Sequence, residues 1–146
     1  MSIPKLKDLL NERDYHLTKP PRRIGGVAIV SEGQILLVKR SETAGKYPNF
    51  WAVPMGGVEK NETFREGAAR ELKEETMLDI NPKDLVYLGA IKDGKYNRFV
   101  KIYKTEMGGK PKPKLDFEHS DWGYYDKHSM PRPIDDRLRQ ILELSL

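Results

Sequence analysis

Three glutamates, Glu71, Glu74 and Glu75, are the residues of this sequence best placed to do chemistry together. They stand at positions i, i+3 and i+4, so an α-helix would put all three carboxylates on one face. Like charges this close repel one another, and the arrangement is unfavourable unless cations occupy it. Hard carboxylate oxygens suit Mg²⁺ or Mn²⁺. The glutamates alone leave a second interpretation open, a solvated acidic face with Arg70 and Lys73 as ion-pair partners.

A clearly marked helix is expected to carry these glutamates. Thr63 is a favourable N-cap residue, and Glu66 three positions later completes a capping box. The helix should extend to about Thr76. An apolar residue recurs every fourth position and predicts the buried stripe, namely Phe64, Ala68 and Leu72. Because the stripe uses other positions, the three glutamates need not be buried in the core.

The residues around this helix follow a longer pattern with fixed spacing. The pattern reads G-x5-E-x7-R-E-L-x-E-E-x-x-L and consists of Gly56, Glu62, Arg70, Glu71, Leu72, Glu74, Glu75 and Leu78. It resembles the signature of the Nudix hydrolase family, and residues 50–54 resemble the W-x-x-P segment that precedes that signature. The resemblance favours metal binding over a solvated acidic face.

The resemblance implies a fold, a reaction and a cofactor. The fold would be of the α/β class, a Nudix-type α/β/α sandwich with a mixed β-sheet. The reaction would be hydrolysis of a phosphoanhydride bond, with Mg²⁺ or Mn²⁺ neutralising the phosphates and acidifying the attacking water. The substrate would be a nucleoside diphosphate linked to another group, such as a nucleotide sugar or a dinucleoside polyphosphate.

The resemblance also implies roles for individual residues. The metal ligands would be Glu71, Glu74, Glu75 and the backbone carbonyl of Met55. The catalytic residues would be Glu71, Glu74, Glu118 and Arg70. Glu62 would pair with Arg70 and orient the helix. The residues expected to contact the substrate are Gly56, Gly57 and Arg40.

Met77 and Met55 depart from the family pattern. Met77 stands where the family has a glycine, which often takes a special backbone conformation after a helix. The shape of that loop therefore does not follow from the resemblance. Met55 replaces the first glycine of a Pro-Gly-Gly turn, but its backbone carbonyl does not depend on the side chain.

The general base is left between two candidates. Family members use either a glutamate of the signature or a later one from a loop. Residues 115–121, which precede an aromatic run, are similar to an E-H-x-x-x-x-W segment of many members, and this makes Glu118 the later candidate. An ordinary loop acid is the alternative interpretation of Glu118. His119 is expected to be structural, and Tyr124 is expected to pack in the core.

The remaining elements can be placed around this centre. Strands are expected at residues 24–30, 34–40, 85–91, 98–105 and 122–125, with a short apolar segment at 50–53. A polar loop is expected at 41–49, a hairpin turn near Asp93-Gly94 and a closing helix at 134–144. Residues 1–22 would form an N-terminal arm, with a short amphipathic helix at 2–13. The length suits a single domain spanning residues 1–146.

Composition excludes several classes of protein. There is no cysteine, which rules out a disulfide scaffold and a thiolate metal site. No segment approaches the roughly 20 apolar residues that span a membrane, and the first residues have no apolar run of signal-peptide type. A cytoplasmic protein without membrane contact is therefore expected. Apolar residues make up 38% of the chain, enough for a folded core.

Several alternatives stay open at this stage. The basic segment 92–114 is either a solvated hairpin or a surface that attracts phosphate-rich ligands, such as an RNA 5′ end. Residues 58–63 and Glu118-His119 are weakly similar to enzymes that hydrolyse GDP-mannose at the sugar carbon. Those enzymes lack the glutamate corresponding to Glu71, so its presence favours attack at phosphorus. A damaged nucleoside triphosphate is another possible substrate. A non-catalytic nucleotide sensor and a homodimer are further options, and a nucleic-acid partner has no direct support.

Overall fold

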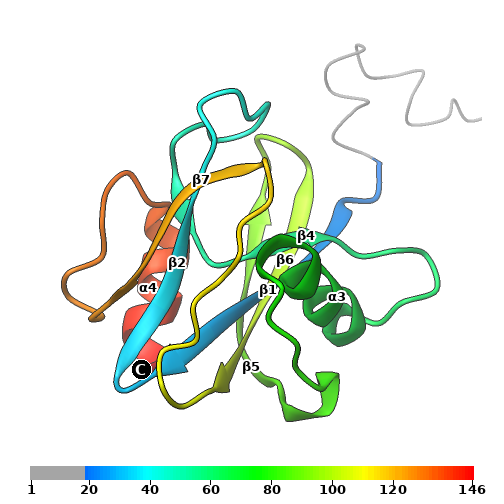
Figure 1. Ribbon diagram of the computed structural model, residues 1–146. Coiled ribbons are helices and arrows are strands. Elements are labelled where there is room, and N and C mark those ends of the chain that lie inside the picture. Colours follow the sequence, from blue (N-terminus) through cyan, green and yellow to red (C-terminus); the bar gives the residue numbers. More distant parts are fainter. Residues whose placement is uncertain (1–18) are drawn as a thin grey trace, which may run out of the picture.

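A mixed β-sheet forms the centre of the protein in this computed structural model, which describes residues 19–146 (Figure 1). The helix expected at residues 2–13 lies outside the described residues. The strands are β1 (Arg22–Ser31), β2 (Gln34–Arg40), β3 (Trp51–Ala52), β4 (Met55–Gly57), β5 (Val86–Asp93), β6 (Arg98–Glu106) and β7 (His119–Tyr125). Their order is β3-β2-β1-β6-β5, with β4 added to β1 and β7 to β2. β1 and β6 run parallel, and the other strand pairs run antiparallel.

Two α-helices cover the two faces of this sheet. In Figure 1 the helix α3 (Phe64–Thr76) lies in front of the sheet and the helix α4 (Asp136–Ser145) lies behind it. A short 3-10 helix, η1 (Pro82–Asp84), leads into β5. The expected α/β/α sandwich with a mixed sheet is therefore confirmed. Within the described part of the chain, neither helix has the length and apolar character needed to cross a bilayer.

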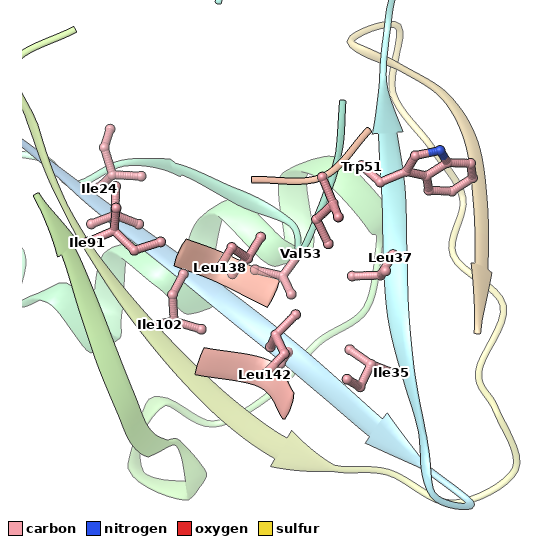
Figure 2. Packing of buried hydrophobic residues seen from close by; sticks show 12 residues of the cluster. Ile24, Ile35, Leu37, Trp51, Val53, Ile91, Ile102, Leu138 and Leu142 are labelled. Carbon is pink, nitrogen blue, oxygen red and sulfur yellow. The ribbon is translucent and has the colours of Figure 1, made fainter. Parts of the chain in front are cut away.

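The strands sort their side chains into two cores by alternation. In β1, Ile24 and Ala28 join the cluster on the α4 side, whereas Val27 and Ile29 join the cluster on the α3 side. Such two-sided burial explains why β1 is an almost unbroken apolar run. Figure 2 shows the α4-side cluster, where strand residues surround side chains of that helix. Its labelled members are Ile24, Ile35, Leu37, Trp51, Val53, Ile91, Ile102, Leu138 and Leu142.

The helix α3 begins where the sequence predicts. The Thr63 side chain accepts from the Glu66 amide at 3.1 Å, and the Glu66 carboxylate accepts from the Thr63 amide at 3.0 Å. Gly25 lets this helix approach β1 closely, because a Cβ there would lie 2.9 Å from the carbonyl oxygen of Phe64. The helix is therefore fixed in position against the strand that runs beneath it.

Met77 ends this helix in the conformation that the family's glycine would take. Its φ of 63° and ψ of 9° are left-handed, and its amide donates to the carbonyl of Lys73. The sequence left the geometry of this loop undetermined, and the structure shows the usual left-handed helix end. Methionine is sterically disfavoured in this conformation, whereas glycine is not. The Met77 side chain is exposed.

Some elements differ from the sequence-based expectation. Residues 55–57 were expected as a turn but form β4, which pairs with residues 24–26. β1 and β2 pair directly only near their hairpin, so β4 provides hydrogen bonds to the part of β1 that β2 leaves. The helix α4 begins at Asp136, two positions later than expected, because Asp135 caps it by accepting from the amides of Arg137 and Leu138.

Candidate active site

A polar pocket, partly open to solvent, lies beside α3 and β4. Acidic and basic side chains from widely separated parts of the chain meet in it. Its lining consists of Arg22, Ile24, Arg40, Ser41, Thr43, Ala44, Gly45, Lys46, Met55, Gly56, Gly57, Glu71, Glu75, Arg98, Phe117 and Glu118. Most of the residues expected to form the site are therefore brought together in one place.

Glu75 is buried in the wall of this pocket, with only 3% of its surface exposed. Its Oε2 atom has no hydrogen-bond partner. The expectation that the glutamates need not be buried in the core is thus wrong for Glu75. Position on a helix face did not predict its burial, because the backbone amide of Asp116, from a distant loop, donates to the Glu75 carbonyl at 3.3 Å.

Burial, together with the negative charges of Glu71, Asp116 and Glu118, raises the pKa of the Glu75 carboxyl to about 9. Burial also raises the pKa of Glu71, although a hydrogen bond from Arg70 opposes that shift. A buried carboxylate without a partner is strongly disfavoured. The pocket therefore favours either a proton or a bound cation at Glu75.

Arg70 binds several acceptors around α3. Its Nε and Nη2 atoms donate to the two carboxylate oxygens of Glu62 at 2.7 and 2.9 Å, and Nη2 also donates to the Gly57 carbonyl at 2.8 Å. Its Nη1 atom donates to Glu71 at 3.1 Å. These hydrogen bonds raise the pKa of Arg70 and lower that of Glu62. The expected pairing of Arg70 with Glu62 is present, and it ties α3 to the loop before it.

Glu74 lies outside the pocket lining. Its carboxylate accepts from Arg70 Nη1 at 3.1 Å, and its side chain is 57% exposed. The role expected for Glu74 in binding metal stays a prediction. The geometry ranks it behind Glu71 and Glu75.

Gly56 leaves room for the Glu71 carboxylate, because a Cβ at this position would overlap the carboxylate atoms. Met55 and Gly57 flank it and line the same pocket. β4 therefore forms a wall of backbone atoms close to the acidic side chains. The expected role of the Met55 carbonyl as a metal ligand stays a prediction.

The cations of the pocket come from strand ends and from the loop 41–49. Arg22 starts β1 and stands opposite Arg98 at the start of the parallel strand β6. Arg40 ends β2, and its Nε atom donates to the Lys46 carbonyl at 2.8 Å. Among the described residues no carboxylate pairs with Arg40, and its pKa is lowered by burial and by the charge of Arg98. Arg40 is thus a partly desolvated cation free to bind an anion.

The basic segment 92–114 does not face the pocket as a unit. Arg98 is its one member in the pocket lining. Lys101 lies 4.5 Å from the centre of the Phe64 ring, and Lys110 pairs with Glu32 at 3.8 Å. The interpretation as a mostly solvated hairpin therefore fits better, with Arg98 as the exception.

A second cavity adjoins the polar pocket and shares Arg40, Met55 and Arg98 with it. Buried Asp93 anchors its wall, accepting from the Tyr47 hydroxyl at 3.1 Å and from Arg98 Nη2 at 3.0 Å. This network positions Arg98 between the two cavities and, through Tyr47, binds the loop 41–49 to β5. Sequence reasoning missed the network and noted Asp93 only as part of a hairpin turn.

The residues fit a divalent cation, on the chemistry of the donors and on the unpartnered Oε2 atom of Glu75. Glu71 and Glu75 would be the inner ligands, with Glu118 across the pocket. As the side chains stand, no three Asp, Glu or His side chains in residues 19–146 converge as a cation cluster. The carboxylates share a pocket, and a cation would draw them together.

The family model of the NUDIX domain matches residues 19–144. The chain therefore belongs to the Nudix family, in agreement with the sheet, the helices on its two faces and the acidic pocket beside α3.

Relatives in the family carry related names. An uncharacterized Nudix hydrolase of Nostoc sp. is 33% identical over 107 residues, which cover 70% of this chain and 63% of that protein. An RNA pyrophosphohydrolase of Hydrogenovibrio crunogenus is 39% identical over 70 residues, covering 48% of this chain and 38% of that protein. The chain thus spans less than two thirds of the length of these relatives.

A solved structure shows the same fold. The MutT NUDIX hydrolase from Burkholderia pseudomallei superimposes with a TM-score of 0.74 at 24% identity, covering 86% of this chain and 98% of that one. At this level of identity the match establishes the fold.

Proposed function

We propose that this protein is a Mg²⁺- or Mn²⁺-dependent pyrophosphohydrolase that cleaves the phosphoanhydride bond of a nucleoside diphosphate linked to another group. The buried Glu75 carboxylate, which has an unpartnered oxygen and shares the pocket with Glu71, is the observation that carries the proposal. Arg40 and Arg98 lie in the same pocket. A site that offers carboxylates to a cation and guanidiniums to an anion suits a cation-bound diphosphate.

The chain's own residues divide the work. Glu71 and Glu75 would hold the cation, which when bound neutralises phosphate charge and makes water a better nucleophile. Arg40 and Arg98 would bind phosphate oxygens and hold the diphosphate of the substrate in line for attack. Glu118, which lines the pocket, would accept the proton of the attacking water. Arg70 would keep Glu71 in position through its hydrogen bond.

Attack is expected at phosphorus. Glu71 keeps the cation near the bridging phosphates, whereas attack at a sugar carbon would need a base reaching away from the carboxylates. Hydrolysis of a nucleotide sugar in ¹⁸O-labelled water distinguishes the two. Label in a phosphate product supports attack at phosphorus, and label only in the anomeric hydroxyl of the released sugar would contradict it.

The test of the function itself is a phosphate-release assay with Mg²⁺ over a panel of nucleotide sugars, dinucleoside polyphosphates, nucleoside triphosphates and 5′-triphosphorylated RNA. We expect turnover of diphosphate-linked nucleosides that stops when a chelator is added. Binding of nucleotides with no turnover of any of them would instead identify a nucleotide sensor.

A further inference from the structure

Phe117 stands out among the residues that line the polar pocket. It is 90% exposed, although it is a large apolar side chain. A single exposed apolar residue is ordinary on a protein surface. Phe117, however, lies at the mouth of the pocket and is the one aromatic residue among those that line it. In residues 19–146 no other ring packs against it.

The loop that carries Phe117 is fastened on both sides. The Lys114 amide donates to the Thr76 carbonyl at 2.8 Å, so the loop is bonded to the last turn of α3. On the other side the Ser41 amide donates to the Glu118 carbonyl at 2.9 Å. The backbone on both sides of Phe117 is thus fixed by hydrogen bonds, while its ring is exposed to solvent.

The side chain of Asp116 holds the bend of the loop next to Phe117. Its Oδ1 atom lies 2.9 Å from His119 Nδ1 and accepts from the Glu118 amide at 3.2 Å. His119 is buried, as its expected structural role requires. The backbone next to the exposed ring is therefore held by hydrogen bonds, so little backbone entropy would be lost when a flat ligand packs against the ring.

We infer that Phe117 is a stacking platform for the nucleobase of the substrate. This inference rests on the proposed function. With phosphates held inward by Arg40, Arg98 and the carboxylates, the nucleoside end of the substrate would extend toward the pocket mouth. A nucleobase has a flat face that stacks on an aromatic ring, and such stacking is worth roughly 5- to 150-fold in affinity. Because every base has such a face, Phe117 would select nucleotides over base-free phosphates, with purines favoured by their larger area.

Nucleotide binding tests this directly, with Leu144 providing a matched control. Leu144 is 89% exposed and lies on α4, outside the pocket lining. In isothermal titration with Mg²⁺, Phe117→Ala should weaken binding of ADP about tenfold and that of UDP less. It should leave binding of inorganic tripolyphosphate unchanged. Leu144→Ala should bind all three like the parent protein, and Phe117→Tyr should retain most of the ADP affinity.

A second variant gives a readout other than affinity. In Phe117→Trp the new indole should lose fluorescence on stacking with ADP but not on binding tripolyphosphate. Equal ADP affinity in Phe117→Ala and the parent, or equal loss for ADP and tripolyphosphate, would overturn the inference. Binding does not need turnover, so a protein that binds ADP through Phe117 but hydrolyses nothing would defeat the proposed function and leave this inference standing.

Discussion

At the scale of single residues, Glu75 is unfavourable for folding when it is charged, and it is the residue best placed to bind a cation. Its carboxyl is buried, has an oxygen without a partner and lies close to other acids, so its pKa is raised to about 9. Nothing in packing requires a glutamate there, because an uncharged isostere would fill the same space. A bound cation would turn an unfavourable buried charge into a ligand.

Replacing Glu75 by glutamine should nearly abolish turnover while leaving the fold intact. The amide removes a ligand charge, and we expect kcat to fall by about 100-fold or more, equivalent to about 2.7 kcal/mol. Glu74→Gln is the matched control, since Glu74 is exposed and lies outside the pocket lining. It should lose less than about tenfold. Steady-state kinetics measure both, and a similar loss in the two variants would contradict the ranking of the ligands.

The raised pKa of Glu75 also predicts how stability depends on pH without metal. Between about pH 5 and 9 the folded protein holds a proton on Glu75 that the unfolded chain has lost. Folding stability should therefore fall as pH rises through this window, by at most about 1.36 kcal/mol per pH unit from this group. Urea denaturation in chelator at pH 6 and pH 8.5 would measure the slope. Glu75→Gln should flatten it and be more stable than the parent at pH 8.5, and an unchanged slope would refute the assignment.

At the scale of elements, the pocket depends on α3 and on the loops that surround the acidic side chains of this helix. Met77 ends this helix in the left-handed region, where a side chain is sterically disfavoured. The loops 41–49 and 111–118 then meet around the pocket, joined by the hydrogen bond between Ser41 and Glu118. The helix supplies the acids, and the loops determine how they are surrounded.

Met77→Gly should stabilise the protein by about 0.5–1 kcal/mol. Glycine removes the penalty of positive φ, and the greater freedom of the unfolded chain offsets part of the gain. The methionine side chain is 63% exposed, so little packing is lost. Thermal and urea denaturation would measure the change, and Met77→Ala should not share the gain. Destabilisation by glycine would show that the methionine makes contacts that outweigh its backbone strain.

Local sequence signals predicted the elements well, and long-range contacts explain what was missed. The capping box at Thr63 and Glu66 predicted the start of α3, and β-branched runs predicted the central strands. The burial of Glu75 and the network at Asp93 could not be predicted, because each depends on segments far away in the chain. The segment that contains Phe117 was noted in the sequence because of Glu118. The exposure of Phe117 could not be predicted, because an apolar residue type gives no sign that the side chain is exposed.

At the scale of the whole molecule, the apolar clusters on the two faces of the sheet support the acidic pocket. Ile24 of the α4-side cluster lines that pocket, and Met55, which packs against this cluster, lines it too. Any ligand that binds the folded pocket and not the unfolded chain must stabilise the whole structure.

Mg²⁺ or Mn²⁺ should therefore raise the melting temperature of the protein. At a concentration 100 times the dissociation constant, the gain would be about 2.7 kcal/mol, a rise of several degrees for a domain of this size. Differential scanning calorimetry with MgCl₂, MnCl₂ and a chelator would measure it. In Glu75→Gln the rise should shrink strongly, and an equal rise in that variant would place the cation elsewhere.

The parallel pairing of β1 with β6 has a consequence for the order of folding. Arg22 lies beside Arg98, so the pairing closes a long loop that contains the whole of β2, α3 and β5. Closing such a loop is slow, because its entropy is lost before the contacts form. The hairpins β1–β2 and β5–β6 are local and can form early. The polar pocket has cations on β1, β2 and β6, so it would come into existence only in the last, slowest step, and recovery of ligand binding after refolding should lag behind recovery of secondary structure.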